Sequence, residues 1–195
     1  MSENWIIYTD GACQPNPGTG SWAYIIIDEH SDKRFSNRGF CLSSDLEEVT
    51  NNKMEIKAVI EGLRYFIFEM NKFGEKITVI SDSSYVTKAI DLWIDKWEQN
   101  QWITYENKPV KNKSLWQEMY KIKKLIKIEC LQIKGHSTNE VNNLVDRMAF
   151  ELTQSVNKIY EIENSNKICG PSKKSVFAAN LDILNTLNKP EDNIG

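Results

Sequence analysis

The sequence lacks the features that mark membrane, secreted and zinc-stabilised proteins. No apolar run approaches the roughly 18 to 20 residues that cross a bilayer, and no basic region with an apolar stretch typical of a cleavable signal follows Met1. The 4 cysteines form no Cys-x-x-Cys pair and have no zinc spacing. We therefore expect reduced thiols, a cytoplasmic location, no membrane partner and no structural zinc. With 9 glycines and 5 prolines, the chain is neither collagen-like nor low in complexity.

The chain also has no overall excess of positive charge. Its 24 lysines and arginines stand against 27 aspartates and glutamates, a formal net charge of -3, which taken alone argues against a nucleic-acid partner. The distribution is uneven, because eight lysines and two glutamates lie between Lys108 and Lys134. One basic segment on a mildly acidic chain is typical of a protein that holds a polyanion on one face, although lysines at helical spacing also form ordinary solvated faces.

The 195 residues are enough for one domain with a tail. Hydrophobic periodicity predicts strands over 5–9, 21–27, 35–42, 76–81 and 128–134, and helices over 52–73, 83–97, 114–126 and 141–156. Three consecutive strands followed by alternation imply an α/β fold, in which helices flank a five-stranded mixed sheet made of an antiparallel meander and parallel strands. We expect a catalytic domain over 1–156 and a C-terminal extension over 157–195.

Four acidic residues occupy positions that this fold can bring together. Asp10 is expected to end the first strand and Asp82 the fourth, so both would lie at the carboxyl ends of neighbouring parallel strands, where α/β sheets bind their ligands. Glu55 is expected in the first turn of the first helix and Asp146 within the last helix. Helices packed on the sheet can bring these two residues to the same end.

Each acid also has a purely structural interpretation. Asp10 begins a common turn dipeptide, Asn52 and Glu55 match a helix capping box, Asp82 can cap the helix that follows, and Asp146 can be solvated. Four converging carboxylates are a different case, because they repel one another and take up protons unless cations lie among them. Hard oxygen ligands favour Mg²⁺ or Mn²⁺.

Four motifs appear in a fixed order along the chain. They are YTDGACQPNPGTG at 8–20, TNNKME at 50–55, SDSSYV at 81–86, and KGH at 134–136 followed ten residues later by Asp146. Together they resemble the motifs of the type 1 ribonuclease H family over residues 5–155. The tryptophan-rich segment 93–116 further resembles the protruding handle of the bacterial members.

The resemblance implies endonucleolytic hydrolysis of the RNA strand of an RNA/DNA hybrid, leaving 5′-phosphate and 3′-hydroxyl ends. It also implies two bound Mg²⁺ ions, with Mn²⁺ as an alternative. Asp10 would bridge both ions, Glu55 and Asp82 would complete one, and Asp146 the other. His136, in the loop before the last helix, would assist by moving protons or helping the product leave.

The same resemblance predicts how the hybrid is recognised. Small polar residues on tight loops suit contacts with 2′-hydroxyls in a shallow minor groove, and the matching positions are Gly11, Asn16, Asn51, Asn52 and Ser84. Thr50 resembles a residue that grips a DNA phosphate, and Trp93 is expected to line the DNA-strand groove. The remaining tryptophans of this region, Trp97, Trp102 and Trp116, are expected to pack in the handle and core.

Three features depart from the family pattern. Ser84 stands where many bacterial members have glutamine, and the handle tip at 98–100 lacks the usual basic cluster, so the grip on the hybrid is expected to be weaker or to shift to Lys108–Lys113. The loop that begins at His136 keeps its spacing to Asp146 but not the amino-acid sequence usual in the family.

Two other functions remain open from the sequence. A polynucleotidyl transferase of the transposase or integrase type also uses an acid cluster, and a non-catalytic nucleic-acid binder can share the fold. The motif at 51–55 and the handle argue against the first, and the presence of all four acids argues against the second.

The C-terminal extension carries a second expectation. Apolar positions over 176–187 predict a short amphipathic helix that ends at Pro190. A lone helix of this length is marginal in water, so we expect it to dock on its own domain rather than on a partner or second copy. The protein is accordingly expected to be a monomer.

Overall fold

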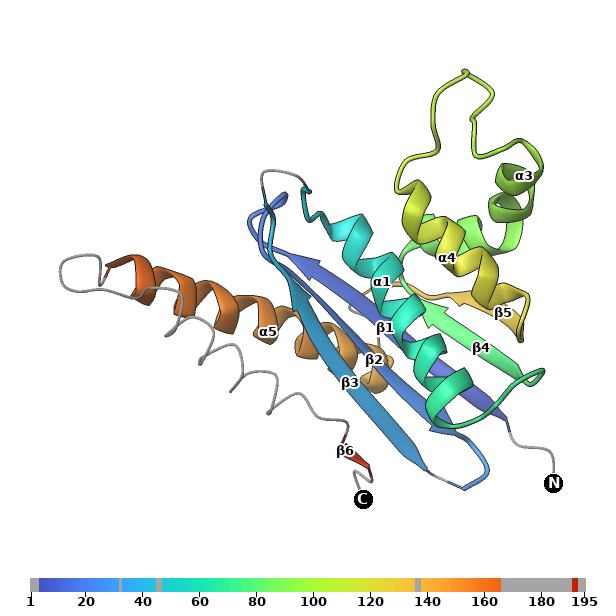
Figure 1. The fold of residues 1–195 in the computed structure, drawn as a ribbon. Helices are drawn as coiled ribbons and strands as arrows, with labels where there is room; N and C mark the ends of the chain where they lie inside the picture. Colours follow the sequence, from blue (N-terminus) through green and yellow to red (C-terminus); the bar gives the residue numbers. More distant parts are fainter. Residues whose placement is uncertain (1–3, 32, 45–46, 136–137, 166–190, 193–195) are drawn as a thin grey trace.

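The computed structural model describes residues 4–31, 33–44, 47–135, 138–165 and 191–192. Within them, six strands form one sheet in the order β5-β4-β1-β2-β3-β6 (Figure 1). The strands are β1 (Trp5–Cys13), β2 (Gly20–Asp28), β3 (Arg34–Cys41), β4 (Lys76–Ser81), β5 (Lys127–Gln132) and β6 (Glu191–Asp192).

The sheet is mixed, as the sequence pattern predicts. β1, β2 and β3 form an antiparallel meander, whereas β4 pairs in parallel with both β1 and β5. The parallel crossovers require intervening helices, which accounts for the alternation of strand and helix after residue 50. The two-residue β6 pairs with β3 and adds a sixth strand that the pattern did not predict.

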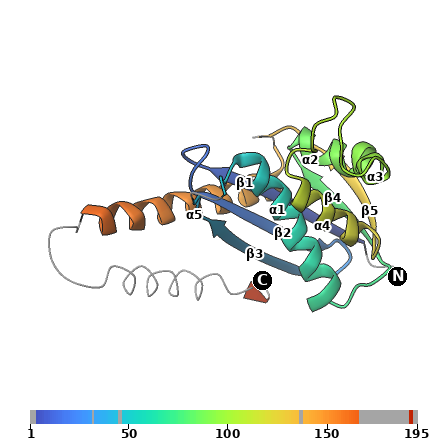
Figure 2. The same cartoon turned by 45° about the horizontal axis from the view of Figure 1, so that its top comes forward.

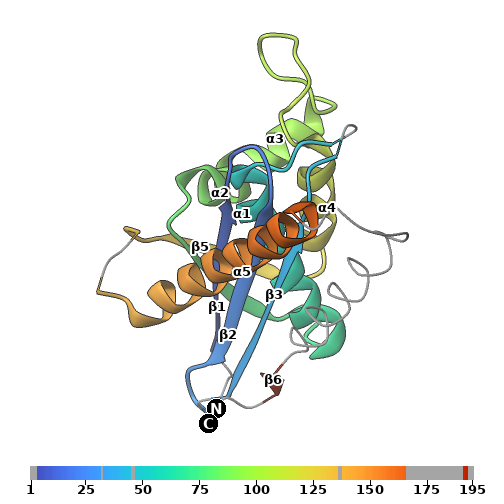
Figure 3. The same ribbon diagram turned by 90° about the vertical axis from the view of Figure 1, so that its left-hand side faces the viewer.

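Helices cover both faces of the sheet. The α-helices described are α1 (Asn51–Arg64), α2 (Ser84–Lys88), α3 (Ile94–Gln99), α4 (Lys113–Lys123) and α5 (Glu140–Ser165). Two π-helical turns, η1 (Tyr65–Glu69) and η2 (Ala89–Trp93), follow α1 and α2 directly. Figures 1 and 2 show α1 and α4 side by side on one face. Figure 3 shows α5 lying across β1, β2 and β3 on the opposite face.

Each face has its own apolar cluster. On the α1 side, Ile7 and Ile26 of the sheet pack with α1 and with the fully buried Trp116 of α4. On the α5 side, Ile25 of β2 packs with Val145 and other apolar residues of α5. A sheet buried on both faces keeps the carboxyl ends of its parallel strands at a fixed position between the two helical layers.

Several predicted boundaries were wrong. The first strand, predicted over 5–9, continues to Cys13, and the helix predicted over 83–97 is divided into α2, η2 and α3. The helix predicted over 52–73 begins at Asn51, changes to a π-helical turn after Arg64 and ends before Met70. The last helix continues beyond 156 to Ser165. The predicted amphipathic segment 176–187 lies outside the described residues, so its docking stays a prediction.

Among the helices of the described residues, none is both long and apolar enough to cross a membrane.

Candidate active site

Asp10 lies within β1 rather than at its end, which corrects the sequence-based expectation. β1 pairs in parallel with β4 as far as Tyr8 and Ile80, but its pairing with β2 carries it on to Cys13. Tyr8 and Ala12 pack on the α5 side of the sheet. Because side chains alternate along a strand, Asp10 points to the same face as these two residues.

Asp82 and Asp146 come to Asp10 from two further elements. Asp82 directly follows β4, as predicted, and lies two residues beyond Ile80, just as Asp10 lies two beyond its partner Tyr8. Asp146 is a half-buried residue of α5, and its side chain shares a hydrogen bond with that of Asp10. The side chains of these three aspartates therefore converge from a strand, a strand end and a helix.

Glu55 is the fourth acid, and its local role differs from the expected capping box. Thr50 is the N-cap of α1, where its hydroxyl accepts from the Lys53 amide, so Glu55 lies beyond the first turn and caps nothing. Its carboxylate accepts hydrogen bonds from the Ser83 hydroxyl at 2.5 Å and the Asn51 side-chain amide at 2.9 Å. These two donors fix both carboxylate oxygens.

Asp82 is likewise free of the capping role that the sequence allowed. Ser83 is the N-cap of α2, and its hydroxyl accepts from the Val86 amide. The Ser83 amide in turn donates to the Ser81 hydroxyl at 3.1 Å. The turn after β4 is therefore held by serines, and Ser83 rather than Asp82 caps α2.

The acids influence one another electrostatically. Burial, followed by the neighbouring charge of Asp82, raises the pKa of Asp10 to about 8; the Gly11 amide opposes this rise, and Asp146 adds to it. Burial raises the pKa of Glu55 as well, and Asp82 adds to this effect, while the hydrogen bond from Ser83 opposes it. The protein has thus placed carboxylates where a negative charge is costly unless a proton or a cation accompanies it.

These oxygen donors fit a hard divalent cation in chemical type. No set of three or more histidine, cysteine, aspartate or glutamate side chains in the described part of the chain is already arranged to hold a metal ion. The carboxylates instead use protein donors and one another, as in the Asp10–Asp146 hydrogen bond and the bonds from Ser83 and Asn51 to Glu55. The raised pKa of Asp10 is the property that a bound cation would reverse.

Two residues at this site were not assigned a role from the sequence. Ser83 links Glu55 to the start of α2, and a serine directly after an acid at a strand end is the signal that would have indicated it. Gly135 lies against Asp82, because a Cβ built at position 135 would be 2.5 Å from the Asp82 Oδ2 atom. His136 follows Gly135 in the sequence but lies outside the described residues.

Most of the residues expected to contact substrate lie near the acids. Asn16 is exposed on the β1–β2 loop, and its Oδ1 accepts from the Asn51 amide at 3.3 Å, which joins that loop to the start of α1. Asn52 is exposed beside Asn51, and Ser84 is exposed at the first position of α2. Thr50 and the buried Gly11 complete this set, Thr50 through its cap and Gly11 through its contact with α1.

Trp93 lies in a separate aromatic group. Its ring centroid is 6.4 Å from that of Tyr85 and 5.7 Å from that of Trp97, and Trp97 packs in turn on Trp116. Trp116 and Trp102 are buried, which agrees with their predicted packing roles. Trp93 is half-buried, so part of its surface remains accessible.

The segment between α3 and α4 projects from the body (Figure 1), as the handle resemblance predicts. A short bridge between Ile103 and Pro109 closes its protruding loop. Lys108, Lys111 and Lys113 are exposed along this segment. The Lys108 ammonium is 2.9 Å from a carboxylate oxygen of Glu106, so part of its charge is balanced locally.

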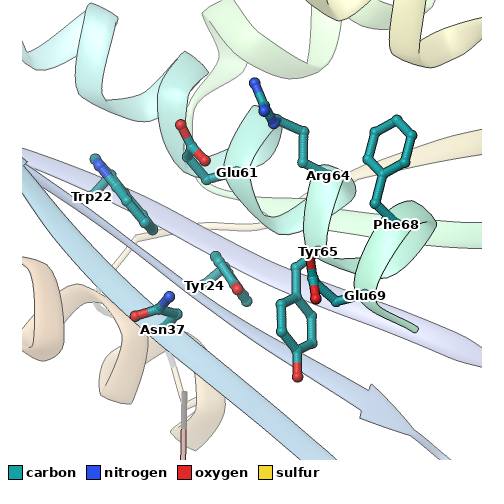
Figure 4. Close-up of a pocket in the computed structure, with 8 residues that line it drawn as sticks. All are labelled: Trp22, Tyr24, Asn37, Glu61, Arg64, Tyr65, Phe68 and Glu69. Atoms are coloured by element: carbon teal, nitrogen blue, oxygen red, sulfur yellow. The ribbon is translucent and has the colours of Figure 1, made fainter. Parts of the chain in front are cut away.

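A cavity of about 320 Å³ lies elsewhere, between α1, η1 and the β2–β3 pair (Figure 4). Its lining contains none of the residues predicted for catalysis or substrate binding; it consists of Trp22, Tyr24, Asn37, Glu61, Arg64, Tyr65, Phe68 and Glu69. Two of its charged groups are already paired, Glu61 with Lys57 at 3.2 Å and Arg64 with Glu118 at 2.8 Å. The cavity is therefore separate from the acid cluster.

Solved structures share this architecture. The chain superimposes with a TM-score of 0.67 on LC9-RNase H1, described as a type 1 RNase H with the type 2 active-site motif, at 19% identity over 80% of this chain and 74% of that one. It matches LC11-RNase H1, solved in complex with an RNA/DNA hybrid, with a TM-score of 0.55 at 20% identity over 77% of this chain and 99% of that one. At these identities the likeness establishes the fold.

Sequence comparisons establish the family of the chain as well as its fold. The chain is 44% identical over 146 residues to a ribonuclease H of Thermoanaerobacter sp. (strain X514), a match that covers 74% of this chain and 86% of the relative. It is 38% identical over 159 residues to a ribonuclease H of Treponema denticola, covering 77% and 97%. The RNase H family model matches residues 2–154. The chain therefore belongs to the type 1 ribonuclease H family and is an endoribonuclease.

Proposed function

We propose that this protein hydrolyses the RNA strand of RNA/DNA hybrids endonucleolytically, leaving 5′-phosphate and 3′-hydroxyl ends. The observation that carries the proposal is the convergence of Asp10, Asp82 and Asp146, with the pKa of Asp10 raised to about 8 by burial and by its acidic neighbours. Such a cluster is costly in water and useful around divalent cations. The family membership and the hybrid complex of LC11-RNase H1 support the choice of substrate.

The four acids would hold two Mg²⁺ ions, or Mn²⁺ in their place. Asp10 would contribute to both, Glu55 and Asp82 to one, and Asp146 to the other. When bound, such a pair supplies positive charge for the attacking water and the leaving oxygen of an in-line phosphodiester displacement. No covalent nucleophile is needed, which fits a site composed of carboxylates.

The surrounding residues would orient these ligands. Ser83 and Asn51 each hold one oxygen of Glu55, so this carboxylate keeps its direction when substrate enters. Gly135 leaves room for the Asp82 carboxylate, where any side chain would collide with it. We further propose that His136, the next residue along the chain, moves protons or helps the product leave.

Selection of a hybrid would rest on the polar residues around the acids. Asn16, Asn51, Asn52 and Ser84 present small polar side chains from the β1–β2 loop and the starts of α1 and α2. Short side chains of this kind can reach 2′-hydroxyls across a shallow minor groove. Thr50 would contact a phosphate of the DNA strand, and Trp93 would line the groove for that strand.

A gel assay tests this function. End-labelled RNA/DNA hybrid, RNA duplex and DNA duplex are each incubated with the protein in Mg²⁺ and in EDTA. Cleavage of the hybrid RNA alone, abolished by EDTA, is the expected result. When the RNA is labelled at its 3′ end, phosphatase treatment should retard the labelled product by removing its 5′-phosphate. A native-gel shift of the hybrid without cleavage would identify a non-catalytic binder, and strand-joined products would identify a polynucleotidyl transferase.

A further inference from the structure

The last helix continues beyond the part of the chain that matches the family, and it contacts the β1–β2 loop at the end of that match and just beyond it. The family match ends at residue 154, whereas α5 continues to Ser165. The side-chain amide of Gln154 donates to the Gln14 side-chain oxygen at 2.8 Å, and that of Asn157 donates to the Gln14 carbonyl at 2.6 Å. Successive turns of α5 therefore hold one residue of the loop.

The other side of the same loop is attached to the start of α1. The Gly18 amide donates to the Val49 carbonyl at 3.0 Å, and the Ser43 hydroxyl donates to the Gly18 carbonyl at 2.9 Å. The Asn51 amide donates to Asn16 Oδ1 at 3.3 Å. The exposed Asn16 is thus carried on a loop held between α1 and α5.

The contact between the loop and α5 contains a hollow as well as hydrogen bonds. A cavity of about 390 Å³ lies between the loop and this part of α5, lined by Pro15, Gly18, Thr19, Leu42, Ser43, Asn157, Tyr160 and Glu161. Close-packed side chains would hold a loop by contact alone, but a hollow gives it room to move. The bonds from Gln154 and Asn157 therefore restrain how far the loop can shift toward α5.

The charge of α5 between residues 151 and 161 argues against direct binding of this segment to the nucleic acid. Between residues 151 and 161 it carries Glu151 and Glu161 against Lys158, so it presents no excess of positive charge to phosphates. Any effect of this helical segment on the substrate is then expected to pass through the loop that it holds.

We propose that Gln154 and Asn157 are positioning residues, which hold the β1–β2 loop so that Asn16 meets the minor groove of the RNA/DNA hybrid. The inference rests on the proposed function, because it concerns how that substrate is bound. It assigns a role in substrate binding to the part of α5 where the family match ends, with Gln154 as the last matched residue and Asn157 beyond it. The two side chains bond to Gln14 rather than to the acids, so substituting them is expected to leave the chemical step unchanged.

A double-mutant cycle tests the inference. The paired substitution Gln154→Ala and Asn157→Ala should raise KM for the hybrid about three- to tenfold, the scale of one or two lost hydrogen bonds, with kcat kept within about twofold. The matched control is Ser155→Ala, which loses only a bond within α5, from its hydroxyl to the Glu151 carbonyl. This control should leave KM and kcat unchanged.

The same pair is then introduced into Asn16→Ala. If α5 acts through Asn16, the pair should add less than about twofold to KM in that background, because coupled residues are not additive. An unchanged KM in the first variant, or a full additional effect in the Asn16→Ala background, would overturn the inference. Failure of the wild type to cleave or bind the hybrid would overturn the proposed function and this inference with it.

Discussion

Gly11 lies directly against the backbone of Glu55. A Cβ built at position 11 would be 2.3 Å from the Glu55 amide nitrogen and 2.4 Å from the Met54 carbonyl carbon. β1 and α1 therefore meet backbone to backbone, one residue after Asp10. This contact fixes the distance between Asp10 and Glu55, which are 45 positions apart in the sequence.

Gly11→Ala should therefore damage both stability and activity. Because the clash is with backbone, α1 must shift away from β1, at a cost of about 1 to 3 kcal/mol, and Glu55 must move with it. Thermal melting and hybrid cleavage together measure the effect. Gly74→Ala is the control, since its Cβ meets no atom within 4 Å and only its φ of 76° is strained; it should melt lower and cleave normally. Normal cleavage by Gly11→Ala would show that this contact does not position Glu55.

Asp10→Asn should raise the melting temperature in EDTA, and by more at higher pH. The pKa of Asp10 is raised to about 8 in the fold, so between the ordinary value of about 4 and that value the folded state keeps a proton that the unfolded state releases. The stabilisation that this Asp10 proton contributes is full below about pH 4 and is lost as the pH rises toward about 8. Asparagine has no such proton. Melting curves from pH 4 to pH 9 should show a growing gain for the variant, and an equal gain at every pH would contradict the raised pKa.

The three exposed lysines of the handle should contribute to binding of the hybrid rather than to the chemical step. Changing Lys108, Lys111 and Lys113 to glutamine should raise KM for the hybrid and flatten its dependence on salt, with kcat little changed, because phosphate contacts release counterions. The matched control changes three exposed lysines at the opposite end of the sheet, namely Lys33, Lys76 and Lys127. A salt slope equal to that of the wild type in the handle variant would place the path of the hybrid elsewhere.

Removal of residues 166–195 should preserve cleavage and lower the melting temperature. The truncation is best placed after Ser165, because α5 extends that far and its residue Asn157 holds the β1–β2 loop. Cleavage should survive because none of the acids is removed, and stability should fall because β3 loses the β6 partner that pairs at Phe35 and Ser36. Loss of cleavage, or conversion of a dimer to a monomer on size exclusion, would contradict the expected docking of the tail on its own domain.

The order of elements could be predicted from the sequence because its signals are local and agree with one another. The strand over 76–81 was predicted with the bounds that the structure shows, since an apolar run there lies between Gly74 and Asp82. The motif spacing also predicted four acids at one end of the sheet, and the mutual effects on the pKa values of Asp10 and Glu55 are consistent with that convergence.

The errors arose where tertiary pairing overrides a local signal and where a local signal was misread. Asp10 and the next residue look like a turn, but pairing with β2 carries β1 on to Cys13. The end of α5 was placed at 156 although no glycine or proline stops the helix there, and the next such residue is Gly170. The capping box failed because Thr50, two residues before Asn52, caps α1 instead.

The central claim is that Asp10 and the neighbouring acids carry the metal-dependent cleavage of RNA in a hybrid. The most direct measurement is single-turnover cleavage of a labelled hybrid in Mg²⁺ by the wild type, Asp10→Asn and His136→Ala. Cleavage should be abolished in Asp10→Asn with the fold intact, while His136→Ala should keep a measurable remainder, because proton-transfer assistance contributes about 10² to 10⁴-fold. Wild-type cleavage by a folded Asp10→Asn would contradict the account.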